Sequence, residues 1–251
     1  MITAVILAKN EEKHIGKTIQ SLSFCNEIIV VDDNSNDATR EIAEKLGCRV
    51  LPRSLNSDFA GQRNFAMEQA KHDWILFVDA DEEVTTELRE NILQNVTNNT
   101  RDIGSYALKR RDFFWGKELQ YGETKKARSV GLIRLMKKRA GVWHGSVHEA
   151  FVPHGTTGSL TGFLDHFPHQ TISEFLQDIN FYSSLRAREL ARKQKTATVF
   201  SLLFFPLGKF ILTYIIYLGF LDGPAGFTYA FMMSFHSFLT RAKLFQYGSR
   251  H

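Results

Sequence analysis

The residues best suited to chemistry in this sequence are two aspartates one residue apart, Asp79 and Asp81. They follow the apolar run 74–78, which has the length and composition of a buried strand. Mg²⁺ and Mn²⁺ commonly take one or two protein carboxylates and complete their coordination with phosphate oxygens. A solvated acidic loop is the alternative. A second acidic pair, Asp32 and Asp33, also follows an apolar run and favours a metal and diphosphate site.

The segments that would position these residues alternate between strand and helix patterns. We expect strands at 2–8, 27–31, 48–51 and 74–78, and helices at 12–23, 36–46, 59–70 and 86–96. This alternation predicts an α/β fold with a mostly parallel sheet and helices on both faces. Ligands of such sheets bind beyond the carboxyl ends of the strands, so the polar residues after three of these strands are expected to converge on one edge.

The second half of the chain is less regular up to residue 151 and helical after about residue 173. We expect strands at 105–113 and 132–137, an amphipathic helix at 175–193, a strongly apolar stretch at 198–221 and a last helix at 227–245. The tripeptide Asp222, Gly223 and Pro224 predicts a break before that last helix.

Composition sets broad bounds on the protein. The 251 residues are 43% hydrophobic and 23% charged, with a net charge of +4, which suits one α/β domain with a smaller appendage. The two cysteines, Cys25 and Cys48, lie beside apolar residues and are expected to be small buried side chains. The N-terminus lacks the features of a signal peptide, so we expect a reducing, cytoplasmic setting.

Four motifs in this order resemble those of glycosyltransferase family 2. They are Ala-Val-Ile-Leu-Ala-Lys-Asn-Glu-Glu at 4–12, Val-Val-Asp-Asp-Asn-Ser-Asn-Asp at 30–37, Gly-Gln-Arg-Asn at 61–64 and Phe-Val-Asp-Ala-Asp-Glu at 77–82. The resemblance implies the GT-A fold, in which a Rossmann-like α/β domain here carries a C-terminal helical extension. It also implies a nucleotide-diphosphate sugar donor, a divalent metal and inversion at the anomeric carbon.

The same resemblance assigns roles to residues at the strand ends. Asp33 would accept a hydrogen bond from the uracil ring, and Asp32 beside it would also face the nucleotide unless it only caps its turn. Arg63 would reach the base or the diphosphate, unless it is a surface residue of its helix. The residues expected to line the base and ribose are Leu7, Ala8, Lys9, Asn10 and Glu11.

The metal site follows from the same motif. Asp79 would face both the ribose and the metal, with Ala80 beside it, and Asp81 would ligate Mn²⁺ or Mg²⁺ directly. His166 is the candidate for a third ligand, because GT-A enzymes often take one from the far side of the site. The alternative for His166 is a structural role.

An inverting transfer also needs a base that takes the proton of the acceptor hydroxyl. Glu149 is the candidate, because it lies beyond the donor half, where GT-A enzymes place the acceptor; a surface carboxylate is the alternative. Asp165 is the second choice. His148 is expected to bind the nucleotide sugar, and His144 and His148 would hold the diphosphate or orient the base.

A narrower resemblance covers most of the chain. Three segments resemble those of bacterial glucosyltransferases of the lipopolysaccharide inner core, which add a hexose to a heptose. They are residues 142–151, the region of Tyr182 and residues 219–223. The expected function is therefore transfer of a hexose, glucose by preference, from a UDP-sugar to a glycan acceptor. The alternatives are polyprenyl-phosphate or protein glycosyl transfer and a non-catalytic nucleotide-sugar sensor, but a sensor needs no base.

The apolar stretch 198–221 raises the question of a membrane. Lys209 in its middle would cost roughly 2.5–3.5 kcal/mol or more at a bilayer centre, and Pro206 and Gly208 also interrupt it. We therefore expect helices on the membrane surface, with packing on the catalytic domain or in a homodimer as the alternative. Flanking cations suit anionic lipid: Arg186, Arg188, Arg192, Lys193, Lys195, Arg241 and Lys243.

These expectations combine into one organisation. A GT-A catalytic domain would cover 1–170, with a nucleotide-binding half at 1–100 and an acceptor half at 101–170. A helical region at 171–251 would contact membrane or another subunit. The protein would be cytoplasmic and peripheral on the inner face of the bacterial cytoplasmic membrane, with a glycan or lipid-linked acceptor and no nucleic-acid partner.

Overall fold

The structure is a computed structural model that describes residues 1–98, 102–145 and 149–248. The chain forms two compact units. The first comprises Met1–Arg110 and Ser129–His166, and the second comprises Arg111–Arg128 and Phe167–His251. The second unit therefore takes in a short central segment as well as the C-terminal helices.

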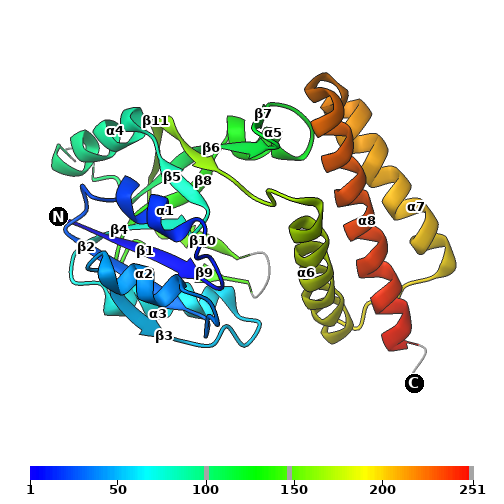
Figure 1. Ribbon diagram of the computed structural model, residues 1–251, viewed down its shortest axis with the longest axis horizontal. Helices are drawn as coiled ribbons and strands as arrows, with labels where there is room; N and C mark the ends of the chain where they lie inside the picture. The colour runs from blue at the N-terminus through cyan, green and yellow to red at the C-terminus, as the bar shows by residue number, and fades with distance from the viewer. Residues whose placement is uncertain (99–101, 146–148, 249–251) are drawn as a thin grey trace. The chain divides into compact units, whose positions relative to one another are not determined.

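A mixed central sheet forms the first unit (Figure 1). Its spatial order is β3 (Arg49–Pro52), β2 (Glu27–Asp32), β1 (Ile2–Ala8), β4 (Trp74–Asp79), β8 (Leu132–Lys137), β6 (Ser105–Phe114), β11 (Thr157–His166) and β5 (Glu82–Val84). The strands from β3 to β4 are parallel, whereas β8 pairs with both β4 and β6 in antiparallel fashion. The predicted α/β fold is confirmed, with parallel pairing concentrated in the N-terminal half.

Helices cover both faces of this sheet, and alternation along β1 explains why. Ala4 and Ile6 belong to a buried cluster with residues of α1 (Ile15–Ser21), α2 (Thr39–Lys45) and α4 (Thr86–Thr97). Val5, between them, points to the opposite face and joins a cluster with residues of α3 (Phe59–Gln69). Successive side chains of a strand face opposite sides, so a strand buried on both faces reads as a continuous apolar run.

The helix predicted at 36–46 is shorter than expected. It begins only at Thr39, because the preceding loop bonds to the loop after β1 instead of continuing the helix. Asn36 N donates to Asn10 Oδ1, and Ala38 N donates to Glu12 Oε2. Helical periodicity in the sequence cannot predict such contacts between two loops.

A two-stranded hairpin, β9 (Gly141–His144) with β10 (Ala150–Pro153), flanks the segment expected to carry the base. The Asn64 side chain ties this hairpin to α3, since its amide donates to Trp143 O at 2.9 Å and accepts from Trp143 N at 3.0 Å. Trp143 also packs edge-on against Phe77 of β4. The region predicted as irregular is thus anchored to α3 and β4.

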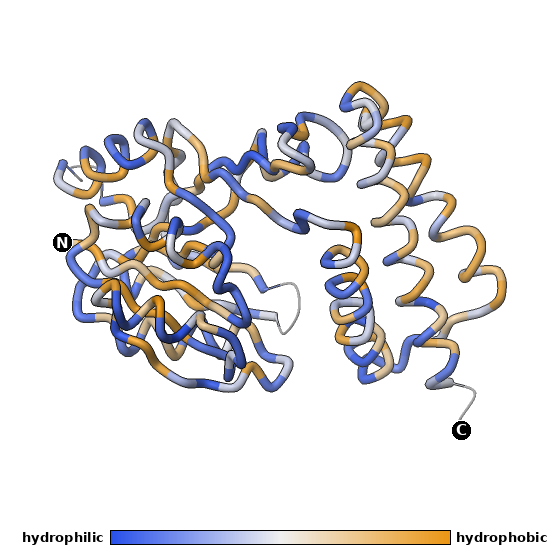
Figure 2. The backbone as a smooth tube through the Cα atoms, viewed as in Figure 1, coloured by the Kyte–Doolittle hydropathy of each residue, from blue (hydrophilic) through white to orange (hydrophobic). Residues whose placement is uncertain are grey.

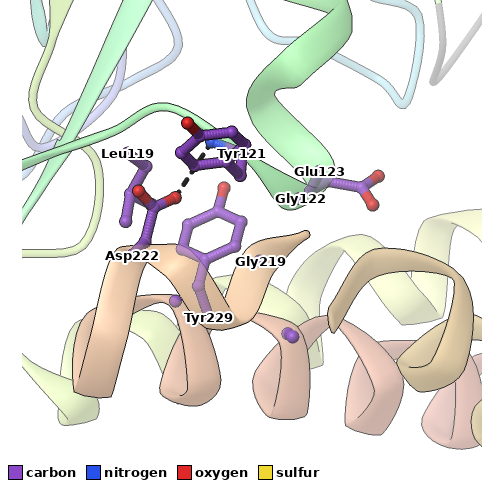
Figure 3. Close-up of a pocket in the computed structure, with 9 residues that line it drawn as sticks. Leu119, Tyr121, Gly122, Glu123, Gly219, Asp222 and Tyr229 are labelled. Carbon is purple, nitrogen blue, oxygen red and sulfur yellow. Dashed lines mark hydrogen bonds between the residues drawn. The ribbon is translucent and has the colours of Figure 1, made fainter. Parts of the chain in front are cut away.

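The second unit is mainly helical. It contains β7 (Lys117–Leu119), η1 (Gly122–Thr124), α5 (Lys125–Ser129), α6 (Ile172–Arg192), α7 (Val199–Phe210), the π-helical turn η2 (Ile211–Ile216), η3 (Gly219–Asp222) and α8 (Gly223–Gly248). Both α6 and α7 pack against α8. Asp222 links η3 to the central segment, because its carboxylate accepts from the backbone N–H groups of Gln120 and Tyr121. Figure 3 shows the contact with Tyr121.

Two predicted helix boundaries in this unit were wrong. The last helix begins at Gly223, ahead of the expected 227, because Pro224 fits the first turn of a helix, where no N–H is needed. The interruption expected at Pro206 and Gly208 does not occur, since α7 runs through both and continues into η2. Ser234 of α8 donates to Pro206 O at 2.8 Å, so packing between the two helices supports the backbone there.

Candidate active site

Three strands bring their carboxyl ends to one edge of the sheet. In the parallel register, Leu7 lies opposite Val31 and Asp79, and Ala8 lies opposite Asp32. The polar residues that follow β1, β2 and β4 therefore start from the same edge, which is where parallel α/β sheets bind ligands. The convergence expected from the sequence is present in the fold.

Asp33 is held at this edge by two contacts. Lys9 Nζ lies 2.9 Å from Asp33 Oδ2, and Leu55 N donates to Asp33 Oδ1 at 2.7 Å. An open hollow of about 340 Å³ adjoins this point and is lined by residues 53–56 and Asp58. Asp32 is buried, and its carboxylate accepts from Ser35 N, which is the turn-capping contact.

The two loops that would enclose a nucleotide are fastened to each other. Asn10 adopts a left-handed backbone conformation, with φ of 56°, and its N–H donates to Ser35 Oγ. Glu11 N donates to Thr39 Oγ1 at 2.7 Å. These bonds hold the loop after β1 against the loop after β2 without a ligand. Binding then loses less conformational entropy, because the two loops are already ordered.

Asp79 lies between two buried arginines. Arg63 Nη2 donates to Asp79 Oδ1 at 2.9 Å, and Arg134 of β8 donates to both carboxylate oxygens, at 3.1 and 2.5 Å. Burial by itself would raise the pKa of Asp79, but the charges and hydrogen bonds of Arg134 and Arg63 hold it well below its usual range. Asp79 is therefore an anion at neutral pH. Its predicted contacts with ribose and metal stay predictions.

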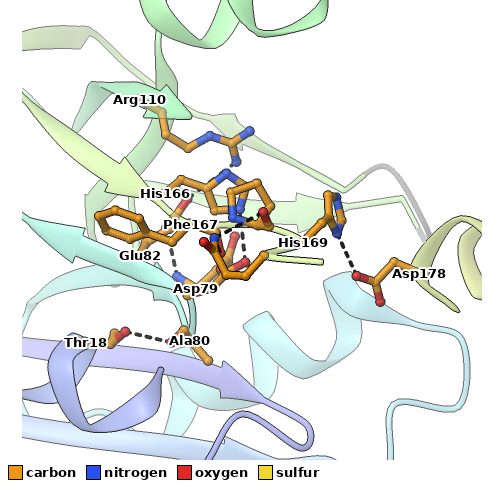
Figure 4. Close-up of polar contacts among 12 residues, drawn as sticks. Thr18, Asp79, Ala80, Glu82, Arg110, His166, Phe167, His169 and Asp178 are labelled. Atoms are coloured by element: carbon orange, nitrogen blue, oxygen red, sulfur yellow. Dashed lines mark hydrogen bonds and ion pairs between the residues drawn. The ribbon is translucent and has the colours of Figure 1, made fainter. Parts of the chain in front are cut away.

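Glu82 and Arg134 belong to this cluster, although the sequence analysis assigned neither of them a role. Glu82 is fully buried, its Oε2 accepts from Asp79 N at 2.9 Å, and its Oε1 lies 3.7 Å from Arg134 Nη2 and 3.5 Å from Arg110 Nη1 (Figure 4). Glu82 follows the Asp-Ala-Asp motif directly, which was a signal for it. Arg134 sits in an ordinary strand pattern that offers no signal.

We expect Arg134→Met to destabilise the protein by about 3–5 kcal/mol at pH 7, because it leaves Asp79 and Glu82 buried without their main cation. Chemical denaturation in metal-free buffer measures this loss. The low pKa of Asp79 stabilises the folded state fully above the unfolded value near 4, and this contribution declines as pH falls below it. The gap between wild type and variant should therefore narrow from about pH 5 downward. A constant gap would contradict the role given to Asp79.

Asp81 and His166 meet at the end of β11. His166 Nε2 lies 3.2 Å from Asp81 Oδ2, and both side chains are mostly buried. Burial would raise the pKa of Asp81, but the charge and hydrogen bond of His166 lower it. Thr18 of α1 donates to Ala80 O at 2.7 Å and so fixes the backbone between the two aspartates (Figure 4).

The donor set fits a divalent cation in part. Asp81 and His166 offer one carboxylate and one imidazole at a single point, and Mg²⁺ or Mn²⁺ can take its other ligands from phosphate and water. Within residues 1–98, 102–145 and 149–248, no group of three His, Cys, Asp or Glu side chains surrounds one position. Asp81 and His166 would therefore be two protein ligands here, the substrate would supply others, and ligation by Asp79 stays a prediction.

Glu149 reaches the same cluster through Arg63. Arg63 Nε donates to Glu149 Oε1 at 2.9 Å, so one guanidinium joins Glu149 to Asp79. Arg63 is 3% exposed, which excludes the alternative of a surface helix residue, and its Nη1 has no hydrogen-bond partner within the described part of the chain. His144 is exposed on β9, and His148 lies outside the described residues. Asp165 lies on β11, opposite Glu83 of β5.

Arg63 lies between two groups of side chains that could perform different chemical steps. On one side are two loops bonded to each other and a carboxylate–imidazole pair suited to a cation. On the other side is Glu149, a carboxylate able to accept a proton, at the edge of the hairpin β9–β10. Displacement of a diphosphate by a hydroxyl needs these two functions next to each other.

Comparison with known proteins was made at the level of family, sequence and fold. A family model described as "Glycosyl transferase family 2" matches residues 3–150. The chain is 32% identical over 250 residues to the lipopolysaccharide core biosynthesis glycosyltransferase LpsC of Rhizobium meliloti (strain 1021), covering 98% of this chain and 92% of that protein. It is 30% identical over 257 residues to an uncharacterized glycosyltransferase of Rickettsia typhi, covering 97% of this chain and 86% of that protein.

A solved structure shares the fold. Glucosyl-3-phosphoglycerate synthase from Mycobacterium tuberculosis, in complex with Mn²⁺, UDP-glucose and phosphoglyceric acid, superposes with a TM-score of 0.51. The two proteins are 15% identical, and the match covers 76% of this chain and 79% of that chain. At this identity the likeness concerns the fold alone.

Proposed function

The chain belongs to glycosyl transferase family 2, and from this premise we propose that it transfers a hexose, glucose by preference, from a UDP-sugar to a glycan hydroxyl with inversion at the anomeric carbon. The observation that carries the proposal is the bridge made by Arg63. It joins Asp79, at the nucleotide-binding edge, to Glu149, on the side of the hairpin. A donor site and a proton acceptor are thereby held in one buried cluster.

The donor half binds the nucleotide through the fastened loops. Asp33, with Lys9 and Leu55 holding its carboxylate, faces the base, and the loop from Leu7 to Glu11 lines the ribose. A divalent cation held by Asp81 and His166 would neutralise the diphosphate as the leaving group departs. Asp79 contributes by holding Arg63 and Arg134 in place beside that charge.

The acceptor half supplies the base. Glu149 takes the proton from the attacking hydroxyl, and Arg63 orients its carboxylate through Oε1 and leaves Oε2 for the acceptor. The acceptor we propose is the core oligosaccharide of lipopolysaccharide, on the strength of the likeness to LpsC over nearly the whole chain. We place the protein at the inner face of the cytoplasmic membrane.

The test is a panel of nucleotide sugars examined by thermal shift with and without Mn²⁺, followed by measurement of UDP release with truncated core oligosaccharides. The proposal expects stabilisation by UDP-hexoses that depends on the metal, and UDP release that depends on the acceptor. Metal-dependent binding without any transfer to core oligosaccharides would move the protein to another acceptor. Absence of nucleotide-sugar binding would end the proposal.

Asp33 provides a separate test of the donor pocket. Asp33→Ala should weaken UDP binding by about 1–3 kcal/mol, because the base loses a hydrogen bond to a charged acceptor. Isothermal titration calorimetry with UDP measures this loss, and metal affinity should change little. Asp58→Ala, at the neighbouring N-cap of α3, is the control for loop disturbance, since it removes a carboxylate from the same hollow. Equal losses in both variants would remove Asp33 from the pocket.

A further inference from the structure

The helix α7 and the turn η2 expose an unusual amount of apolar side chain. The segment Val199–Ile216 is long and apolar enough to cross a membrane by length and composition, yet only 6% of it is buried. Val199 and Phe200 are each 65% exposed and Leu203 is 62% exposed. A core helix of a soluble protein would be mostly buried, so this segment exposes an apolar surface that suits an apolar binding partner. Figure 2 shows the apolar character along almost all of α7.

The neighbouring helix α8 extends this surface. Phe227, Phe231, Phe238 and Phe245 are exposed, and their spacing of four, seven and seven residues places them on one side of α8. Phe227 of α8 contacts the rings of Phe210 of α7 and Tyr214 of η2, so the exposed apolar residues of the two segments adjoin there. We call this the α7–α8 face, made of the exposed apolar residues of 199–216 and these four phenylalanines.

Lys209 does not interrupt this face, contrary to the objection that the sequence raised. Its Nζ lies 2.7 Å from Glu123 Oε2, within the same unit, so its charge is paired. The backbone of the segment is also supported internally. Thr213 donates to Lys209 O at 2.9 Å, and Ser234 donates to Pro206 O. An apolar surface with its polar groups satisfied is compatible with lipid.

The charged residues around the α7–α8 face indicate which kind of partner would bind it. From Gln194 to the C-terminus the sequence contains one acidic residue, Asp222, which is 3% exposed and bonded to backbone N–H groups. Cations collect instead at one end of the face. Arg192, Lys193 and Lys195 are exposed just before α7, and Arg241 of α8 stacks on Phe205 at 4.4 Å. This face therefore offers apolar area and positive charge with no exposed carboxylate within the described residues.

We propose that the α7–α8 face docks on an anionic lipid bilayer. The apolar side chains enter the boundary between head groups and acyl chains, and the cations before α7 and near the end of α8 contact lipid phosphates. A second copy of this chain would bring the same apolar and cationic surface and no acidic complement, so it matches the face less well. The proposal concerns a surface of the second unit and does not depend on which sugar or acceptor the enzyme uses.

The experiment is sedimentation of the full-length protein with vesicles of phosphatidylglycerol and phosphatidylethanolamine, and with vesicles of phosphatidylcholine alone. We expect strong sedimentation with the anionic vesicles and partial release at 1 M NaCl, because salt screens the cation–phosphate attraction but not apolar insertion. The double variant Phe200→Glu and Leu203→Glu should lower the partition coefficient at least tenfold. Val130→Glu is the matched control, because Val130 is 63% exposed in the first unit, and it should bind like wild type.

Circular dichroism and UDP binding establish that each variant is folded, since all three positions are exposed. Three results would overturn the proposal: wild type that stays in solution with both kinds of vesicle, a double variant that sediments as well as wild type, or equal binding to neutral and anionic vesicles. A wild-type dimer in analytical ultracentrifugation that the double variant abolishes, without vesicle binding, would assign the face to a second copy. Failure of UDP binding with intact vesicle binding would count against the enzymatic proposal alone.

Discussion

Glu149→Gln is expected to lower kcat by about 10²–10⁴ while leaving the Michaelis constant for the donor nearly unchanged. Glutamine keeps the shape of the side chain and can still accept from Arg63 Nε through its carbonyl oxygen. It cannot take a proton at neutral pH, and positioned proton transfer is worth a factor of that size. The base acts on the acceptor in the transition state, so ground-state binding of the donor should not suffer. Steady-state kinetics with saturating acceptor measure both constants.

Two companion variants make this result specific. Asp165→Asn tests the second candidate on β11, and it should retain most of its activity if Glu149 is the base. Arg63→Lys keeps a charge but loses the fork that holds Glu149 and Asp79 together, so it should lower kcat and also raise the Michaelis constant for the donor. Full activity of the glutamine variant would exclude Glu149 as the base. Loss of activity only in the Asp165 variant would transfer the role to that residue.

Asp81→Asn should abolish the metal-dependent part of UDP binding. Asparagine preserves size but removes the anionic ligand, and loss even of residues that only support a metal ligand typically costs about 10–100-fold in metal affinity or activity. The loss from Asp81 itself should therefore exceed that range. UDP affinity measured in EDTA should remain near the wild-type value, because Asp33 and the fastened loops are untouched. Calorimetric titration of UDP with and without Mn²⁺ gives both numbers.

His166 and Asp79 separate direct ligation from support of the site. If His166 ligates the metal, His166→Ala should also lower Mn²⁺ affinity, and the loss should appear in direct Mn²⁺ titration by electron paramagnetic resonance. Asp79→Asn should instead lower stability, because Arg63 and Arg134 lose the anion between them. Unchanged metal affinity in both Asp81→Asn and His166→Ala would show that the cation site lies elsewhere.

The strands and helices of the first hundred residues could be predicted from the sequence because their signals are local. An apolar run that ends in acidic residues, such as the run before Asp79, predicts within ten residues both a buried strand and the polar residues at its carboxyl end. The parallel register of β1, β2 and β4 then follows from the βαβ pattern, which leaves few arrangements open. The same strand-end pattern singled out Asp32, Asp33, Asp79 and Asp81, whereas Glu149 was chosen from the family resemblance and its place in the chain.

Boundaries and interruptions were less predictable. The start of α2 depends on Asn10 and Glu12 of another loop, and α7 continues through Pro206 where Ser234 of α8 packs against it. Propensity describes a segment by itself, and tertiary contacts of this kind outweigh it. The early start of α8 at Gly223 has a local reason, because Pro224 fits the first turn of a helix.

The sequence by itself determined the fold class, the family and the edge of the sheet where chemistry is expected, since hydrophobic period and motif order depend only on neighbouring residues. Only the tertiary structure decided how the charges pair. Arg134 pairs with Asp79 across 55 residues of sequence, Arg63 pairs with Glu149 across 86, and Lys209 pairs with Glu123 across 86. Ion pairs depend on distance in space and on burial, and no local pattern encodes either.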